Sequence, residues 1–125
     1  MTTVAELMNK GGLLYVAPST TVAEAATMMG ERRVGSALVM EGDALLGIFT
    51  ERDIVKALGA DFDAAKHQVA EWMTRNPTTV PPESPARDAL KTMLDGGFRH
   101  LPVLEGDKVI GVVSMRDLSR LESEA

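Results

Sequence analysis

The sequence predicts a mixed α/β protein that is built from two copies of one small unit. The chain has 125 residues, and residue i corresponds to residue i+64 without a gap from Val16/Val80 to Leu58/Glu122. Within each copy, short apolar runs typical of β-strands alternate with segments whose apolar residues follow helical spacing. Identical pairs include Gly47/Gly111, Arg52/Arg116 and Asp53/Asp117. This degree of self-similarity indicates an internal duplication.

Composition excludes several classes of protein. Hydrophobic residues make up 45% of the chain and charged residues 25%, which is typical of a globular domain. The absence of cysteine excludes disulfides, thiolate metal sites and a cysteine nucleophile. A net charge of −5 and few aromatic residues disfavour a nucleic-acid surface. With neither a long apolar run nor a signal-peptide pattern, we expect a cytoplasmic protein that does not enter membranes.

The first half of each copy predicts a short helix, an extended stretch and a longer helix. The short helices are VAELM at 4–8 and VAEWM at 69–73, and they align at an offset of 65, with the extra residue placed at Lys10-Gly11-Gly12. The extended stretches end at Val16 and Val80. We expect Thr20 and Ser84 to cap the longer helices, with Pro85 at the first helical position. These helices run to about Arg32 and Asp95, and Gly96-Gly97 stops the second one.

The second half of each copy predicts a β-hairpin and a last helix. Apolar runs at 37–40 and 45–49, and at 101–104 and 109–113, flank a Glu-Gly-Asp turn. Gly47 and Gly111 lie inside the second strands, where the missing side chain lets another backbone or a ligand come close. The last helices begin after Thr50 and Ser114.

This order of elements predicts how the chain is organised. We expect repeat 1 at residues 1–60, a short connector at 61–68 and repeat 2 at 69–125. Each repeat would form a small three-stranded sheet with helices on one face. A lone half of about 60 residues is marginally stable, so the other apolar face of each sheet needs a partner. We expect the second copy to supply it by pseudo-twofold packing.

The most distinctive pattern is a hydroxyl residue followed three positions later by an acid, at Thr50/Asp53 and Ser114/Asp117. Such a pair fits a capping box, in which hydroxyl and carboxylate satisfy backbone N–H groups at a helix start. A ligand site is the alternative, because a helix N-terminus attracts phosphate and a carboxylate accepts the two hydroxyls of a ribose. Arg52 and Arg116 in the same turns would either neutralise phosphate or form ordinary surface salt bridges.

The doubled order of elements and the repeated TERDI and SMRDL blocks resemble the CBS domain family, in the form of a tandem pair called a Bateman module. The resemblance runs from about Val4 to Leu121 and implies a stand-alone regulatory module. CBS pairs bind adenosyl compounds such as AMP, ADP, ATP, S-adenosylmethionine or NAD. The resemblance also implies a homodimer that acts on an unidentified protein target, with no covalent cofactor and no catalytic residue.

The resemblance implies further ligand-binding residues, in clefts between the two repeats. Thr50 and Asp53 would act with 76–80, including Val80, and with Arg99 and Pro102; Ser114 and Asp117 would face 12–16 and 35–38. Arg99 would reach a phosphate, and its neighbours, including His100, would wall the adenine. Repeat 1 has Gly35 and Ser36 where repeat 2 has Arg99 and His100, so the two sites should differ.

Two other hypotheses are kept beside the sensor. The departure of repeat 1 from the Arg-His pattern favours a protein-interaction or dimerisation module with vestigial pockets, whose acids serve only as caps. An enzyme is disfavoured, because the sequence has neither a glycine-rich phosphate loop nor a triad motif. A metal site is disfavoured as well, because the potential ligands are not clustered.

Overall fold

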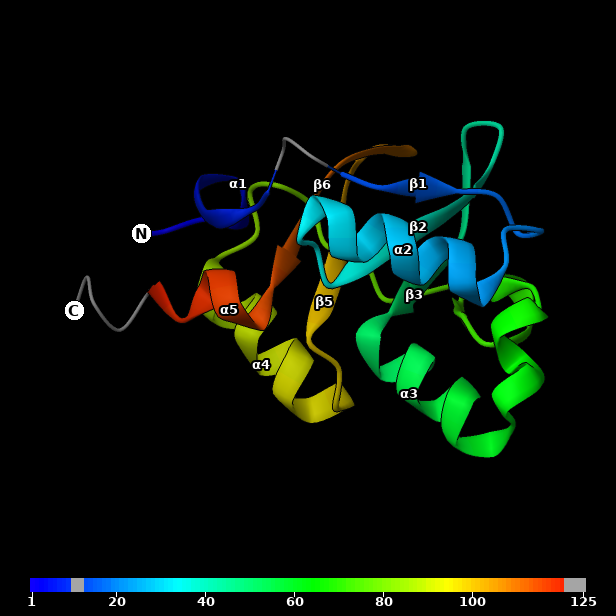
Figure 1. Ribbon diagram of the computed structural model, residues 1–125. Helices are drawn as coiled ribbons and strands as arrows, with labels where there is room; N and C mark the ends of the chain where they lie inside the picture. Colours follow the sequence, from blue (N-terminus) through cyan, green and yellow to red (C-terminus); the bar gives the residue numbers. More distant parts are fainter. Residues whose placement is uncertain (10–12, 121–125) are drawn as a thin grey trace. The chain divides into compact units, whose positions relative to one another are not determined.

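The computed structural model describes residues 1–9 and 13–120 (Figure 1). The chain divides into two compact units: residues 12–77, here called the middle unit, and residues 1–11 with 78–125, here called the terminal unit. The middle unit contains most of repeat 1, the connector and residues 69–77 of repeat 2, while the first helix of repeat 1 belongs to the terminal unit. The sequence repeats and the compact units are therefore divided at different residues.

The middle unit contains a four-stranded sheet in the order β1-β2-β3-β4. Strand β1 is parallel to β2, and the other neighbouring pairs are antiparallel. The three strands expected from the repeat are thus joined by β4, which comes from the segment after the connector. The elements of this unit are β1 (Tyr15–Val16), α2 (Val22–Arg32), β2 (Ser36–Glu41), β3 (Ala44–Thr50), α3 (Glu51–Ala60), the 3-10 helices η1 (Phe62–Lys66) and η2 (Val69–Glu71), and β4 (Thr74–Arg75).

The terminal unit has a two-stranded sheet of β5 and β6, with a single bridge on each edge where the middle unit has further strands. The hairpin strands β5 and β6 pair antiparallel, with His100 opposite Ser114. Val80 forms a parallel bridge to Val103 on one edge, and Asn9 forms an antiparallel bridge to Val112 on the other. Its elements are α1 (Val4–Leu7), α4 (Ala86–Gly96), β5 (His100–Glu105), β6 (Lys108–Ser114) and α5 (Met115–Leu118).

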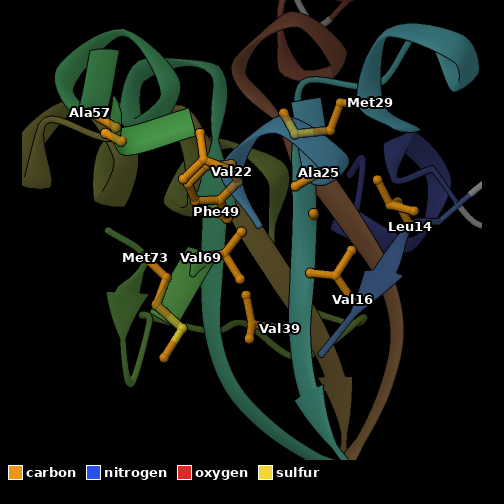
Figure 2. Close-up of a cluster of buried hydrophobic side chains, with 12 residues drawn as sticks. Leu14, Val16, Val22, Ala25, Met29, Val39, Phe49, Ala57, Val69 and Met73 are labelled. Carbon is orange, nitrogen blue, oxygen red and sulfur yellow. The ribbon is translucent and has the colours of Figure 1, made fainter. Parts of the chain in front are cut away.

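Each unit has its own apolar core. In the middle unit, side chains of α2, β2 and β3 and that of Val69 in η2 point toward one another (Figure 2). Phe49 is the largest of the fully buried side chains, and the fully buried Ala64 shows that the connector is packed against this core. In the terminal unit, Val4 and Leu7 of α1 are buried against α4, β5 and β6. The first helix of each repeat therefore completes the core of the unit that contains the other repeat's hairpin.

The predicted order of elements is confirmed, but the short helix expected at 69–73 is the 3-10 helix η2, and the extended stretch ending at Val80 forms a single bridge instead of a strand. Two helix starts also differ from the prediction. Thr21, not Thr20, caps α2, because its hydroxyl accepts from Glu24 N (3.1 Å) while Glu24 accepts from Thr21 N (3.0 Å). Pro85, not Ser84, is the N-cap of α4. Ser84 is held outside the helix because its carbonyl accepts from Val4 N (2.9 Å), and Thr3 forms a bridge to Pro85. The insertion expected at Lys10-Gly11-Gly12 lies outside the described residues.

Gly47 and Gly111 occur where another backbone approaches the hairpin, as the sequence predicts. A Cβ at Gly47 would lie 2.6 Å from the Thr74 carbonyl oxygen and 2.7 Å from the Met73 sulfur. A Cβ at Gly111 would lie 2.6 Å from the Met8 sulfur and 3.1 Å from the Asn9 carbonyl oxygen. The neighbour is in both cases the short extended segment that follows the first helix of a repeat.

Within the described ranges, no helix combines the length and the apolar character that a membrane span requires.

Candidate functional site

In the middle unit the candidate residues gather where β3 ends and α3 begins. Asp53 Oδ2 accepts from Thr50 N (2.9 Å) and from the Thr50 hydroxyl (3.2 Å), which confirms the predicted capping box. Ser36 lies opposite Thr50 in the sheet register, and Glu51 N donates to the Gly35 carbonyl (3.2 Å). Thr50, Asp53, Gly35 and Ser36 therefore form one contiguous group.

The terminal unit has the same arrangement with different side chains. Asp117 Oδ2 accepts from Ser114 N (2.9 Å), and the Ser114 hydroxyl accepts from Asp117 N (3.0 Å). His100 lies opposite Ser114, and Met115 N donates to the Arg99 carbonyl (2.8 Å). Arg99 and His100 therefore stand beside α5 as Gly35 and Ser36 stand beside α3. The expected combination of residues from both repeats in one site stays a prediction.

The remaining candidates differ in how much of them is accessible. Arg52, Arg116 and Arg99 are exposed residues. Val80 and Pro102 are buried, and Val80 N donates to the Pro102 carbonyl (3.1 Å).

Burial distinguishes the middle-unit group from an ordinary helix cap. Among the described residues, the polar or charged side chains that are buried are Ser36 (9% exposed) and Asp53 (8% exposed). Both belong to the candidate site. Asp117 is more open, with 25% of its side chain exposed. Burying a polar group is costly unless it is hydrogen-bonded, and the bonds from Thr50 offset part of that cost at Asp53.

Asp53 and Glu24 show what this burial does to a capping acid. Both carboxylates accept from the backbone N–H of a threonine three residues earlier. Burial raises the pKa of Asp53 above its usual value, although the bonds from Thr50 and the charges of Lys56 and Arg52 act in the opposite direction. The bonds from Thr21 lower the pKa of the exposed Glu24. Glu24 shows that an acid can complete a capping box while it stays exposed, so capping does not require the desolvation of Asp53.

We expect this difference to appear in the pH dependence of stability. The folded chain holds the Asp53 proton more tightly than the unfolded chain, because its pKa is raised. The contribution of Asp53 to the free energy of unfolding is therefore full below the unfolded pKa and is lost as pH rises through the folded pKa. Chemical denaturation from pH 7 to about pH 4 should show wild type gaining stability relative to Asp53→Asn as pH falls.

Glu24→Gln is the matched control for that measurement. The pKa of Glu24 is lowered, so its contribution is present above the unfolded pKa and is lost as pH falls through the folded pKa. Wild type should therefore lose stability relative to Glu24→Gln over the same range. A difference of the same sign for both variants would contradict the role of burial at Asp53.

Sequence reasoning missed Arg120, which touches the terminal-unit group. Its Nη2 lies 3.6 Å from Asp117 Oδ1, and its Nε donates to the Asp117 carbonyl (3.3 Å). The signal was present in the sequence, because Lys56 occupies the equivalent position 64 residues earlier and both copies therefore carry a cation three residues after the acid. Among the residues the structure describes, no three His, Asp or Glu side chains are grouped as metal ligands would be.

The sequence model of the CBS domain family matches residues 4–60 and 69–124 of the chain. The chain belongs to the CBS domain family. This confirms the resemblance found in the repeated blocks, and the fold agrees with it. The CBS-domain containing protein ATU1752 from Agrobacterium tumefaciens superposes with a TM-score of 0.89 at 30% identity, over 97% of this chain and 99% of that one.

Two other solved CBS proteins were determined with adenosyl ligands. The CBS domain pair of protein MJ0100, in complex with 5'-methylthioadenosine and S-adenosyl-L-methionine, has a TM-score of 0.87 at 28% identity and covers 99% of this chain and 98% of that one. CBSX2 in complex with AMP has a TM-score of 0.83 at 25% identity, with 99% of this chain and 98% of that one covered. Adenosyl compounds are therefore ligands of CBS pairs similar to this one.

Curated relatives place the CBS pair in longer proteins. An uncharacterized 17.7 kDa protein of Acidianus ambivalens is 44% identical over 84% of this chain, which spans 64% of that relative. The CBS domain-containing protein CBSCBSPB5 of Arabidopsis thaliana is 40% identical over 82% of this chain, which spans 19% of its length. The chain thus corresponds to part of each of these proteins.

Proposed function

We propose that the chain is a regulatory CBS module that binds an adenosyl compound at the Thr50/Asp53 group, the Ser114/Asp117 group or both. The observation that carries the proposal is the burial of two polar residues of the candidate site, Asp53 (8% exposed) and Ser36 (9% exposed). An ionised carboxylate there would accept both ribose hydroxyls. The adenosyl ligands of MJ0100 and CBSX2 support the same ligand class.

The side chains around each group define what each would recognise. In the terminal unit, Arg99 offers a planar, permanently charged fork that suits a phosphate, and Arg116 adds a second exposed cation. In the middle unit, Gly35 has no side chain and Ser36 offers one hydroxyl, so neither supplies a charge for a phosphate. Arg52 in the first turn of α3 would be the neighbouring cation. The two groups would therefore differ in their preference for charged phosphate groups.

The module would signal through a shift in conformational populations and carries no chemistry of its own. A ligand that contacts one arrangement of the chain better than another raises the population of that arrangement by its difference in affinity.

We propose a cytoplasmic homodimer that acts on a protein target. Exposed apolar side chains of α3 and η1, Val55 and Phe62, are candidates for cover by a partner. Analytical ultracentrifugation measures the molecular mass in solution, and a mass equal to that of one chain would contradict the dimer.

The second candidate is an interaction module without a ligand, and the capping boxes favour it. Thr50/Asp53 and Ser114/Asp117 each complete a cap in the absence of any ligand. In that case adenosyl compounds would leave the thermal midpoint of unfolding unchanged.

A thermal-shift panel separates the two candidates. Nucleotide-stripped protein is heated with AMP, ADP, ATP, S-adenosylmethionine, 5'-methylthioadenosine or NAD at about 1 mM each. A ligand that binds only the folded chain raises the midpoint in a saturable way. We expect such a rise with one or two of these compounds and none with inorganic phosphate or cytidine monophosphate. A flat response to the whole panel would exclude adenosyl binding of millimolar affinity and favour the interaction module.

A further inference from the structure

One guanidinium in the terminal unit touches two elements that are far apart in the sequence. Arg120 Nη2 donates to the Leu7 carbonyl at the end of α1 (2.7 Å), across 113 residues of chain. The same Nη2 lies 3.6 Å from Asp117 Oδ1, and Nε donates to the Asp117 carbonyl (3.3 Å). Arg120 therefore links α1 to the acid of the candidate site.

Arg120 bonds a carbonyl that the short helix α1 cannot satisfy by itself. The last carbonyls of a helix have no partner within the helix, and a cation there is favoured by the helix dipole. The rest of the segment is held by backbone bonds: Val4 N donates to the Ser84 carbonyl (2.9 Å) and Asn9 N to the Val112 carbonyl (2.9 Å). These bonds hold the start of α1 and the residue beyond it, and Arg120 holds the end of the helix.

The two oxygens of Asp117 have different partners. Oδ2 accepts from Ser114 N, whereas Oδ1 faces Arg120. A ligand hydroxyl that takes Oδ1 would compete with the guanidinium for it. Because the donors of arginine lie in one rigid plane, a change at Asp117 alters the geometry at Leu7 as well. Lys56, the equivalent residue in the first repeat, has no such fork.

We propose that Arg120 is a positioning residue that couples the Asp117 carboxylate to the seating of α1. Occupation of Oδ1 loosens the Leu7 contact, so that residues 4–9 open more often. The coupling between Asp117 and α1 is a property of the ligand-free chain. Its use in signalling rests on the function proposed above.

Amide hydrogen exchange of the ligand-free full chain tests the coupling by a double-mutant cycle. The reporters are the amides of Met8 and Asn9, which donate to Val4 and Val112 carbonyls. Arg120→Met should speed their exchange about tenfold, as expected for loss of a bond to a charged group. Asp117→Asn, which keeps an acceptor for Ser114 N, should speed it several-fold. The double variant should exchange no faster than Arg120→Met alone.

Controls separate coupling from general destabilisation. Lys91→Met removes an exposed ion pair to Asp95 (3.9 Å) in the same unit and should leave the reporters unchanged. Ser114→Ala removes a cap bond of α5 but keeps both charges, so it should not reproduce the effect of Asp117→Asn. Arg120→Lys should restore part of the protection. Additive effects, or unchanged exchange in Asp117→Asn, would overturn the proposal.

A second arm adds AMP at saturation as the probe. AMP should speed exchange at Met8 and Asn9 in wild type and have no further effect in Arg120→Met. If AMP fails to bind, the proposed function is weakened, while the ligand-free cycle still decides whether Arg120 couples Asp117 to α1. Binding of AMP at Ser114/Asp117 without any change at Met8 or Asn9 would overturn the use of the coupling in signalling.

Discussion

Asp53→Ala is expected to abolish the thermal stabilisation that an adenosyl ligand gives at the middle-unit group, and Asp117→Ala to do the same for the terminal-unit group. A ligand present at 100 times its Kd stabilises the folded chain by about 2.7 kcal/mol. Under the proposed function, removing a carboxylate that would accept two ribose hydroxyls costs affinity, since a hydrogen bond to a charged group contributes about 1.5 to 3 kcal/mol. Affinity at the affected site should fall at least about tenfold, as measured by titration calorimetry.

The loss of a helix cap must be separated from the loss of a ligand contact. Asp53→Ala also removes the acceptor for Thr50 N, and loss of a cap costs about 1 kcal/mol. Glu24→Ala is the matched control, because Thr21 and Glu24 form the same capping box at the start of α2 in the same unit. That variant should keep the ligand-induced shift. Equal loss of the shift in Glu24→Ala and Asp53→Ala would indicate a general effect of helix capping, and wild-type affinity in both aspartate variants would contradict their role as ligands.

Gly47→Ala is expected to be strongly destabilising, by about 1 to 3 kcal/mol. The added Cβ would lie 2.6 Å from the Thr74 carbonyl oxygen, which belongs to the backbone of β4 and cannot turn away. Strand β4 would have to move from β3, where Gly47 pairs with Arg75 and Asn76 N donates to the Leu46 carbonyl (3.1 Å). Urea denaturation followed by circular dichroism measures the loss.

Two other glycines calibrate that measurement. Gly111→Ala should cost less than Gly47→Ala, because its nearest obstacle is the flexible Met8 side chain and the Asn9 carbonyl oxygen is 3.1 Å away. Gly30→Ala lies inside α2 with nothing near its Cβ position, so it should stabilise the chain by about 1 kcal/mol. A neutral Gly47→Ala, or a larger cost at Gly111, would contradict the close backbone approach.

The sequence allowed prediction of features that depend on neighbours in the chain. The capping boxes at Thr50/Asp53 and Ser114/Asp117 span three residues each, and both are present. The hairpins follow from apolar runs around Gly42 and Gly106, whose positive φ values of 60° and 63° suit the turn. Gly97 ends α4 at φ 73°, whereas α2 ends at Arg33 with φ 56°, which a sequence rule that looks for glycine does not find.

Features that depend on distant residues could not be predicted. Helix α4 is capped one residue later than the sequence predicts. The reason is that the Ser84 carbonyl accepts from the backbone N–H of Val4, which lies 80 positions earlier in the chain. The placement of α1 in the terminal unit and the contact between Arg120 and Leu7 join opposite ends of the chain. The burial that separates Asp53 from Glu24 also depends on packing around the helix, since both acids occupy the same position in a capping box.

The central claim, that the Thr/Ser-x-x-Asp groups bind an adenosyl ligand, is tested most directly by an amide NMR titration of nucleotide-stripped, nitrogen-15-labelled protein with the compound that gives the largest thermal shift, or with AMP if none does. We predict saturable shifts concentrated at the amides of residues 50–53 or 114–117 and of the adjoining residues 35–36 or 99–100, with one apparent Kd shared by the amides of the same group. Unchanged spectra at millimolar ligand, or shifts confined to residues outside both groups, would contradict the claim.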